Sequence, residues 1–252
     1  MKKLVNILKR INPWKAKEIP LNDSQFIKNI CKFAINECVV GDYYEFGVYR
    51  GQTLISIYLK LMQVASKRIR NTGNTDKETE SLVSRKEIKE TTIFHAFDSF
   101  EGLPTLSNED NKSSDFAKGQ YSAGVNVVKN LAKTHGMPQK RIYFHKGWFS
   151  ETCTKDYFLS NSLKPASIIW LDCDLYSSAK DALSLIKLII QDGTMIVIDD
   201  WYCFKGHPER GVQKAWNEFI QLEEVKNEFK FSEYQNDGWA RKSFVVNKIE
   251  DR

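Results

Sequence analysis

Short apolar runs alternate with amphipathic stretches along most of the chain. The run at residues 168–171 is unbroken, and a second such run covers residues 194–198. Continuous apolar runs of this length are typical of strands that are buried on both faces of a parallel sheet. Residues 42–51 predict a strand that runs into a glycine turn, and apolar residues at positions 54, 57, 58, 61, 62 and 65 have helical spacing and predict a helix after it.

The same reasoning gives the other elements. A helix is expected from Asp23 or Ser24, either of which would be its N-cap, to about Cys38. Further strands are expected at residues 92–97, 141–145, 231–235 and 243–249, and further helices at 122–136, 209–228 and after an N-cap at Ser177 or Ser178. Strand–helix units followed by a terminal strand pair predict an α/β fold with a mostly parallel, seven-stranded sheet and an antiparallel C-terminal strand.

The chain of 252 residues is long enough for one α/β domain, expected at 41–252 after an N-terminal helical extension at 1–40. Within it, residues 67–91 are rich in charges and interrupt the apolar rhythm, which predicts a surface insertion with a helical piece at 80–89.

The net charge of +5 is concentrated at the N-terminus, where residues 1–17 hold six bases and no acid. The rest of the chain is nearly neutral, which argues against nucleic-acid binding. Residues 2–11 predict a short basic amphipathic helix. Such a helix is able to lie on a membrane surface, but packing on its own domain or on a second subunit is favoured, and we expect a homodimer.

The five cysteines are scattered without C-x-x-C spacing, as expected of free thiols in a reducing compartment. No apolar run approaches the roughly 20 residues of a membrane span, and the N-terminus lacks the pattern of a secretory signal. A cytoplasmic protein without a membrane span is therefore expected.

Residues 45–51 run from a strand through Gly47 and Gly51 into a helix, an arrangement that brings backbone close to a nucleotide-like ligand. The G-x-G-x-x-G spacing of dinucleotide-binding folds is absent, and the turn alone leaves ligand binding and a purely structural role open. Asp98 follows Gly51 by 22 residues once residues 67–91 are left out. This is the place of an acid that binds ribose hydroxyls, although a loop aspartate that caps its own turn is the alternative.

Two further segments are candidates for the same site. The polar loop at residues 105–121 is a candidate lid over a substrate. Trp148 and Phe149, at the exit of the strand at 141–145, would flank an adenine or belong to the core.

Two acid pairs carry the strongest chemical signal. Asp172 and Asp174 follow the run at 168–171, and Asp199 and Asp200 follow the run at 194–198. Ligands of parallel sheets collect at the carboxyl ends of the strands, and clustered carboxylates suit a hard cation such as Mg²⁺. A cation also removes the repulsion among them. The alternative is that these are separate helix-capping or solvated loop acids. The four histidines are far apart, so zinc spacing is missing.

Four motifs in this order, at residues 45–51, 98–104, 171–176 and 198–201, resemble those of the macrocin O-methyltransferase family. The resemblance covers roughly residues 40–245. It implies a Rossmann-like class I methyltransferase that uses S-adenosylmethionine and Mg²⁺ to methylate a hydroxyl on a sugar of a natural product. The chain departs from the family at Trp201, where tyrosine or phenylalanine is common, and in the length of the insertion at 67–91.

The resemblance also implies roles for individual residues. Asp174 is the expected general base, and Asp172, Asp199 and Asp200 are the expected metal ligands. The predicted cofactor-binding residues are Glu45, Gly47, Val48, Tyr49, Gly51, Thr53, Asp98, Ser99, Ser122, Gly147 and Trp148. A sugar hydroxyl is too weak an acid for a carboxylate of pKa about 3.9 to deprotonate unaided, which agrees with a cation in the site.

Two other functions stay open at this point. A nicotinamide-dependent oxidoreductase would share the sheet but should show the missing glycine fingerprint. A methyltransferase-like scaffold that binds a partner through residues 1–17 or 67–91 would bind the cofactor without turnover.

Overall fold

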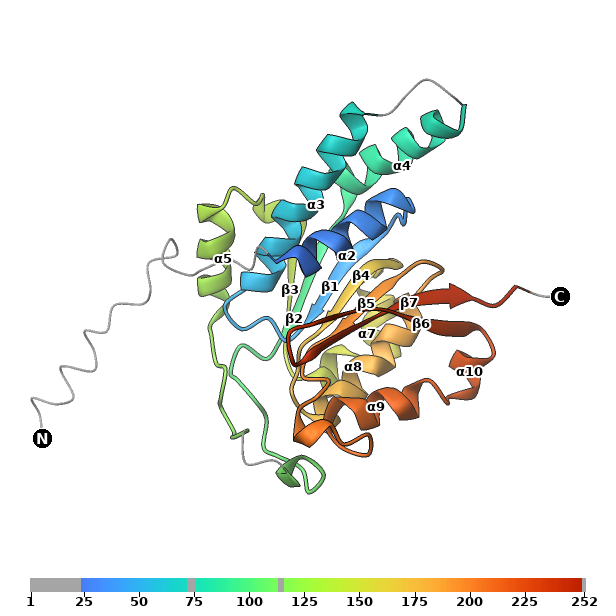
Figure 1. Ribbon diagram of the computed structural model, residues 1–252. Coiled ribbons are helices and arrows are strands. Elements are labelled where there is room, and N and C mark those ends of the chain that lie inside the picture. Colours follow the sequence, from blue (N-terminus) through green and yellow to red (C-terminus); the bar gives the residue numbers. More distant parts are fainter. Residues whose placement is uncertain (1–23, 72–75, 113–115, 251–252) are drawn as a thin grey trace, which may run out of the picture.

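The computed structural model describes residues 24–71, 76–112 and 116–250. The helix expected at residues 2–11 lies outside these ranges. Figure 1 labels the elements of the described residues from α2 onward.

All seven predicted strands form one sheet with the order β3-β2-β1-β4-β5-β7-β6. The strands are β1 (Asp42–Phe46), β2 (Phe94–Asp98), β3 (Ile142–Lys146), β4 (Ala166–Leu171), β5 (Met195–Ile198), β6 (Phe229–Asp237) and β7 (Arg241–Lys248). β1 to β5 pair in parallel, whereas β7 pairs antiparallel with both β5 and β6. The predicted fold class is confirmed, with a C-terminal hairpin supplying the antiparallel strands.

The ends of the central strands are level with one another. Phe46 pairs with Phe97 on one side and with Leu171 on the other, and Leu171 pairs with Ile198. The residues that follow are joined by backbone hydrogen bonds, from the Asp172 amide to the Phe46 carbonyl and from the Asp199 amide to the Leu171 carbonyl, at 2.9 and 2.8 Å. The sheet therefore delivers its strand-end residues to one edge.

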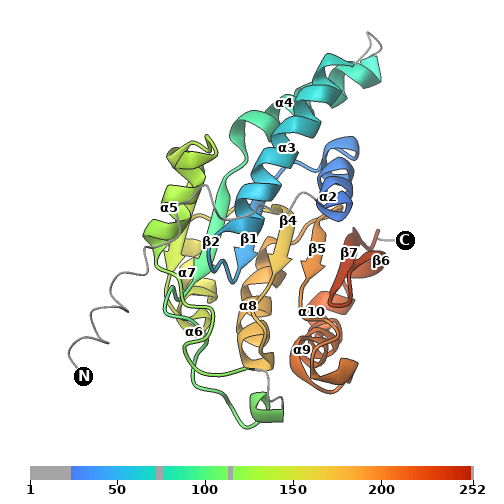
Figure 2. The same ribbon diagram turned by 60° about the vertical axis from the view of Figure 1, so that its left-hand side comes forward.

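Helices cover both faces of the sheet (Figures 1 and 2). On one face lie α2 (Gln25–Asn36), α3 (Gln52–Arg70), α4 (Asp76–Thr91) and α5 (Val125–Thr134). On the other lie α6 (Phe149–Thr152), α7 (Lys155–Ser160), α8 (Tyr176–Ile189), α9 (Gly211–Phe219) and α10 (Glu223–Lys226). The result is a three-layer α/β/α arrangement.

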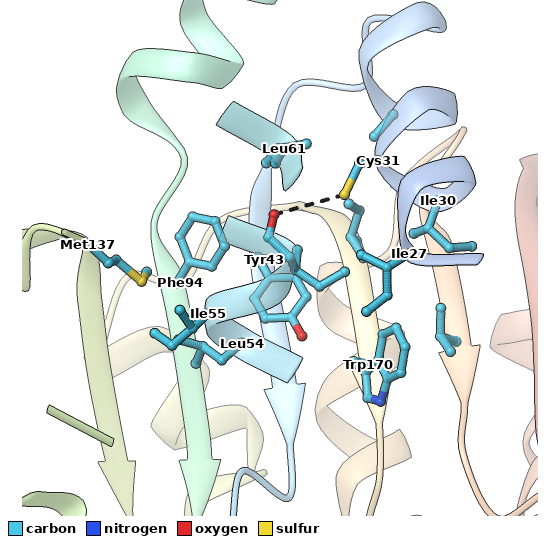
Figure 3. Close-up of a cluster of buried hydrophobic side chains, with 14 of the residues drawn as sticks. Ile27, Ile30, Cys31, Tyr43, Leu54, Ile55, Leu61, Phe94, Met137 and Trp170 are labelled. Carbon is cyan, nitrogen blue, oxygen red and sulfur yellow. Dashed lines mark hydrogen bonds between the residues drawn. The ribbon is translucent and has the colours of Figure 1, made fainter. Parts of the chain in front are cut away.

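The core on the α2–α3 side is built from large side chains of the central strands. Tyr43 on β1 and Trp170 on β4 are fully buried there, and Phe26 meets the Trp170 ring edge-on at 6.1 Å. Ile27 and Ile30 of α2 close the same cluster (Figure 3). As predicted, α2 starts after Ser24, whose hydroxyl accepts a hydrogen bond from the Ile27 amide at 3.2 Å.

The core on the other side rests on α8, whose apolar stripe is buried as expected. The N-cap prediction was wrong, because α8 begins at Tyr176 with Leu175 as N-cap and no side-chain cap. Ser177 lies inside the helix, and its hydroxyl donates to Asp110 instead.

The described residues of the predicted insertion belong mainly to two helices, α3 and α4, which pack on each other. α3 continues to Arg70, and α4 covers Asp76–Thr91, so the helical piece expected at 80–89 belongs to a longer helix. The helix pair is also attached to the domain, because Ile88 is fully buried and the Lys89 carbonyl accepts a hydrogen bond from Arg141 at 2.7 Å.

Other differences concern short helices. The helix expected at 209–228 divides into α9 and α10 around Ile220 and Leu222, and α6 and α7 were not predicted. Segments of four to six residues carry too little periodicity to be recognised in a sequence. Among the described residues, no helix has the length and apolar character to cross a membrane.

Candidate active site

A cavity of about 600 Å³ opens at the carboxyl ends of β1 to β5. The turn between β6 and β7 and the loop after β2 complete its walls. Its lining includes ten of the predicted site residues, namely Gly47, Tyr49, Asp98, Ser99, Gly147, Trp148, Asp172, Asp174, Asp199 and Asp200. The strand-end position of the motifs therefore brings most of them together, as the fold requires.

Gly47 lies where the backbone after β1 comes closest to the backbone after β4. Its φ is +88°, and a Cβ built on it would lie 1.7 Å from the Asp172 carbonyl oxygen. Only glycine fits so close an approach of two backbones. The glycine that was predicted to face the cofactor thus also has a packing reason to be there.

Asp98 holds the glycine turn in place. One of its carboxylate oxygens accepts hydrogen bonds from the amides of Val48 and Tyr49 at 2.7 and 3.1 Å, and the other accepts from the Phe100 amide at 2.6 Å. The turn-capping alternative considered for Asp98 is thus realised, while its cavity-lining position still allows it to bind a ribose hydroxyl. Ser99 stabilises the next turn by donating to the Gly102 carbonyl at 2.9 Å.

Five predicted cofactor-binding residues are not part of the cavity lining, namely Glu45, Val48, Gly51, Thr53 and Ser122. Glu45 and Val48 are buried, Gly51 precedes α3 and packs on Val128, Thr53 lies in the first turn of α3, and Ser122 is exposed. A role for these five in binding the cofactor stays a prediction.

The four aspartates reach the cavity because the chain turns after each strand. β4 ends at Leu171 and β5 at Ile198, so the alternation of an extended strand does not apply to the acids. Asp174 and Asp200 have left-handed backbone, with φ of 61° and 56°. Such values are uncommon for residues other than glycine and tend to mark functional sites.

The acids influence one another strongly. Burial, followed by the charges of Asp200 and Asp199, raises the pKa of Asp174 to about 8. Burial and then Asp199 raise the pKa of Asp200 to about 6, and burial and the same neighbours raise the pKa of Asp172 well above its usual range. The free site therefore disfavours full ionisation, as expected of carboxylates gathered in one place.

Arg241 was not singled out from the sequence, although it is the one arginine of the cavity lining among the described residues. Its Nε donates to Asp199 at 2.7 Å and its Nη1 to Asp237 at 3.1 Å. Arg241 opens β7, so the antiparallel hairpin supplies the countercharge for one acid. Its position next to a short strand-to-strand link was the only signal in the sequence.

The donor set fits a hard divalent cation. Asp200 Oδ2 is buried without a hydrogen-bond partner, and the surrounding ligands are carboxylate oxygens. As the side chains stand, no three His, Cys, Asp or Glu residues of the described chain are arranged closely enough to hold an ion. A bound cation would have to draw the carboxylates together.

The described parts of the loop after β2, residues 105–112 and 116–121, lie beside the acids, and a role as a lid stays a prediction. Asp110 is fully buried and accepts hydrogen bonds from the hydroxyls of Ser107 and Ser177 at 2.5 and 2.6 Å. Leu103 and Phe116 pack with Leu175 and Phe204 in a small apolar cluster. The loop is thereby attached to the two segments that carry the acid pairs.

The family model described as Macrocin-O-methyltransferase (TylF) matches residues 79–240. A curated relative from Streptomyces olivaceus, an 8-demethyl-8-(2,3-dimethoxy-alpha-L-rhamnosyl)-tetracenomycin-C 4'-O-methyltransferase, is 25% identical over 168 residues. That match covers 65% of this chain and 54% of the relative, so the chain spans about half of the relative's length.

Solved structures agree on the fold. The O-methyltransferase NovP gives a TM-score of 0.60 at 15% identity, over 92% of this chain and 86% of its own. The calicheamicin methyltransferase CalS11 gives 0.58 at 16% identity, over 97% and 90%. An O-methyltransferase from Bacillus cereus, solved in complex with SAH, gives 0.55 at 9% identity, over 98% and 96%. This likeness confirms the class I methyltransferase fold, and together with the family match it shows that the chain belongs to the macrocin O-methyltransferase family.

Proposed function

We propose that this protein is an S-adenosylmethionine-dependent, Mg²⁺-dependent O-methyltransferase that methylates a sugar hydroxyl of a glycosylated small molecule. The observation that carries the proposal is the convergence of two strand-end acid pairs with the Gly47 turn and Asp98 in one cavity. The curated relative, named for methylation of a rhamnosyl compound, supports the choice of a sugar acceptor.

We divide the cavity into a cofactor half and an acceptor half. The cofactor half, with Gly47, Asp98 and Trp148, would bind S-adenosylmethionine at the ends of β1 to β3. The acceptor half, at the ends of β4 and β5, would hold the sugar. Because the strand ends are level, the reacting hydroxyl and the methyl donor would meet above the junction of β1 and β4.

Asp174 is the proposed general base. As the acceptor oxygen bonds to the methyl carbon and the carbon–sulfur bond breaks, Asp174 would take the hydroxyl proton. Asp172, Asp199 and Asp200 would hold Mg²⁺, and Arg241 would keep Asp199 oriented. When bound, the cation supplies positive charge that stabilises the developing alkoxide.

The proposal is tested by measuring release of S-adenosylhomocysteine with a panel of glycosides. We expect release with at least one glycoside, loss of release with EDTA and recovery with Mg²⁺. Turnover that is fully resistant to EDTA would contradict the metal. NAD-dependent oxidation of a glycoside without methyl transfer would favour the oxidoreductase, and cofactor binding without any turnover would favour the scaffold.

Asp174→Asn tests the base. General bases contribute about 10²- to 10⁴-fold, so we expect kcat to fall at least about 100-fold while the Kd for S-adenosylhomocysteine changes little. Asp181→Asn is a matched control, since Asp181 also lines the cavity but lies on α8, away from the strand ends. Unchanged kcat in Asp174→Asn would remove Asp174 from the role of base.

Cytoplasmic location and a homodimer remain predictions. Sedimentation of the full chain would settle the second.

A further inference from the structure

Two aromatic residues of the cavity wall have no part in the proposed mechanism. Tyr121 and Trp239 both line it, and their side chains remain 47% and 72% exposed. Large aromatic side chains left open to water at the wall of a cavity are characteristic of ligand-binding surfaces.

Tyr121 lies at the boundary between the two halves. Its ring meets that of Tyr49, just after β1, edge-on with centroids 5.8 Å apart. Burial, and then the charges of Asp174, Asp200 and Asp172, raise the pKa of Tyr121, which agrees with a phenol close to the acids. The residue also has left-handed backbone, with φ of 59°, a costly conformation for a tyrosine.

The position of Tyr121 is fixed by the loop on which it sits. The Leu103 amide donates to the Gln120 carbonyl at 2.8 Å, and the Gly119 amide donates to the Leu103 carbonyl at 2.9 Å. The two limbs of the loop are therefore paired directly before Tyr121. A backbone that is held in this way loses little conformational entropy when a ligand packs on Tyr121.

Trp239 lies at the other end of the acceptor half, in the turn between β6 and β7. The turn is anchored to the segment of the second acid pair, because the Trp201 amide donates to the Ala240 carbonyl at 2.8 Å and Arg241 donates to Asp199. In the sheet, β4 and β5, which precede the acids, lie between β1, whose following residue Tyr49 contacts Tyr121, and the β7–β6 pair, whose turn carries Trp239. The two aromatic residues therefore flank the acids.

We infer that Tyr121 and Trp239 form an aromatic clamp that packs against the sugar ring of the acceptor and presents one of its hydroxyls to the acids. A pyranose has weakly polar C–H faces and hydroxyls around its edge, so flat aromatic rings match its faces while carboxylates match its edge. This inference rests on the proposed function and adds to it the residues that would select a sugar ring.

The clamp is tested with Tyr121→Ala, Trp239→Ala and Trp239→Phe. Tyr143→Ala is the matched control, because Tyr143 is 56% exposed on β3 and does not belong to the cavity lining. Each variant is assayed with the methyl glycoside and the para-nitrophenyl glycoside of the sugar that the unmodified protein methylates best. The Kd for S-adenosylhomocysteine shows that each variant is folded.

We expect each alanine variant to raise the KM for both glycosides by about tenfold, an effect typical of losing one stacked ring. Trp239→Phe should recover most of the loss, and Tyr143→Ala should match the unmodified protein. The Kd for S-adenosylhomocysteine should stay within about twofold, since neither ring is assigned to the cofactor.

Unchanged KM in both alanine variants would overturn the clamp. A rise in KM for the para-nitrophenyl glycoside alone would also overturn it, because the rings would then pack on the aglycone. If the unmodified protein releases no S-adenosylhomocysteine with any glycoside, the proposed function itself fails, and this result is distinct from a failure of the clamp.

Discussion

Glu45 is a buried acid on β1 whose carboxyl accepts a hydrogen bond from the Tyr43 hydroxyl. Burial raises its pKa from 4.5 to about 8. Because the pKa is higher in the folded state, the folded protein binds the proton more tightly than the unfolded chain does. The stability linked to Glu45 is complete below pH 4.5 and is lost as the pH rises through about 8.

Glu45→Gln should therefore flatten this part of the pH dependence. Glutamine retains an acceptor for Tyr43 but does not ionise, so we expect the variant to be more stable than the unmodified protein by about 4 kcal/mol at pH 8 and nearly equal at pH 4.5. Urea unfolding at both pH values measures the difference. If the free energy of unfolding depends on pH in the same way in the variant and in the unmodified protein, Glu45 is not protonated in the folded protein at neutral pH.

At the residue scale, the sequence predicted acids that the structure places in the cavity lining, but not how they reach it. Apolar runs that end in Asp172 and Asp199 are visible in the sequence because burial of the strand requires them. The left-handed backbone at Asp174 and Asp200 is not visible, since aspartate does not require it. Tyr121 and Trp239 were missed because the exposure of an aromatic residue depends on the surrounding fold.

At the element scale, the loop after β2 depends on Asp110, which joins it to α8 through Ser107 and Ser177. Asp110→Ala would leave two hydroxyls without their acceptor, at a cost of about 1–3 kcal/mol. We expect faster proteolysis within residues 105–121 and a higher KM for the acceptor.

Glu109→Gln is the control for Asp110→Ala. Glu109 forms an ion pair with Lys214 at 3.0 Å, and its side chain is 39% exposed, so its removal should change stability by less than about 1 kcal/mol. Equal proteolysis of Asp110→Ala and the unmodified protein would show that Asp110 does not hold the loop.

Amphipathic helices longer than about ten residues were predictable because a repeated apolar face fixes both their type and their orientation. The ends of these helices were harder to predict. Ser177 and Ser178 are good N-cap residues, yet the N-cap of α8 is Leu175, two residues before Ser177, and the Ser177 hydroxyl donates to Asp110. Tertiary hydrogen bonds of this kind lie outside any local pattern.

At the scale of the whole molecule, binding of S-adenosylhomocysteine should stabilise the fold. At 100 times its Kd a ligand contributes about 2.7 kcal/mol, which corresponds to a rise in Tm of roughly 5–10 °C for a chain of this size. Differential scanning fluorimetry with S-adenosylhomocysteine and with NAD measures the effect. A shift with NAD alone would contradict the assignment of the cofactor half.

The overall fold followed from the order of strands and helices, because alternating units admit few topologies. The cavity could not be predicted from the order of strands and helices. Its wall joins residues from β1, the loop after β2, β4, β5 and the β6–β7 turn, and only the level strand ends bring these together.

The contact between Gly47 and the Asp172 carbonyl links two parts of the predicted site. These residues are far apart in the sequence. Gly47 belongs to the predicted cofactor turn, and Asp172 belongs to the predicted metal site. With no room for even a methyl group between them, a substitution at position 47 that was selected for a new cofactor would displace an acid as well. The glycine turn and the segment that carries Asp172 are therefore coupled in this chain through their backbones.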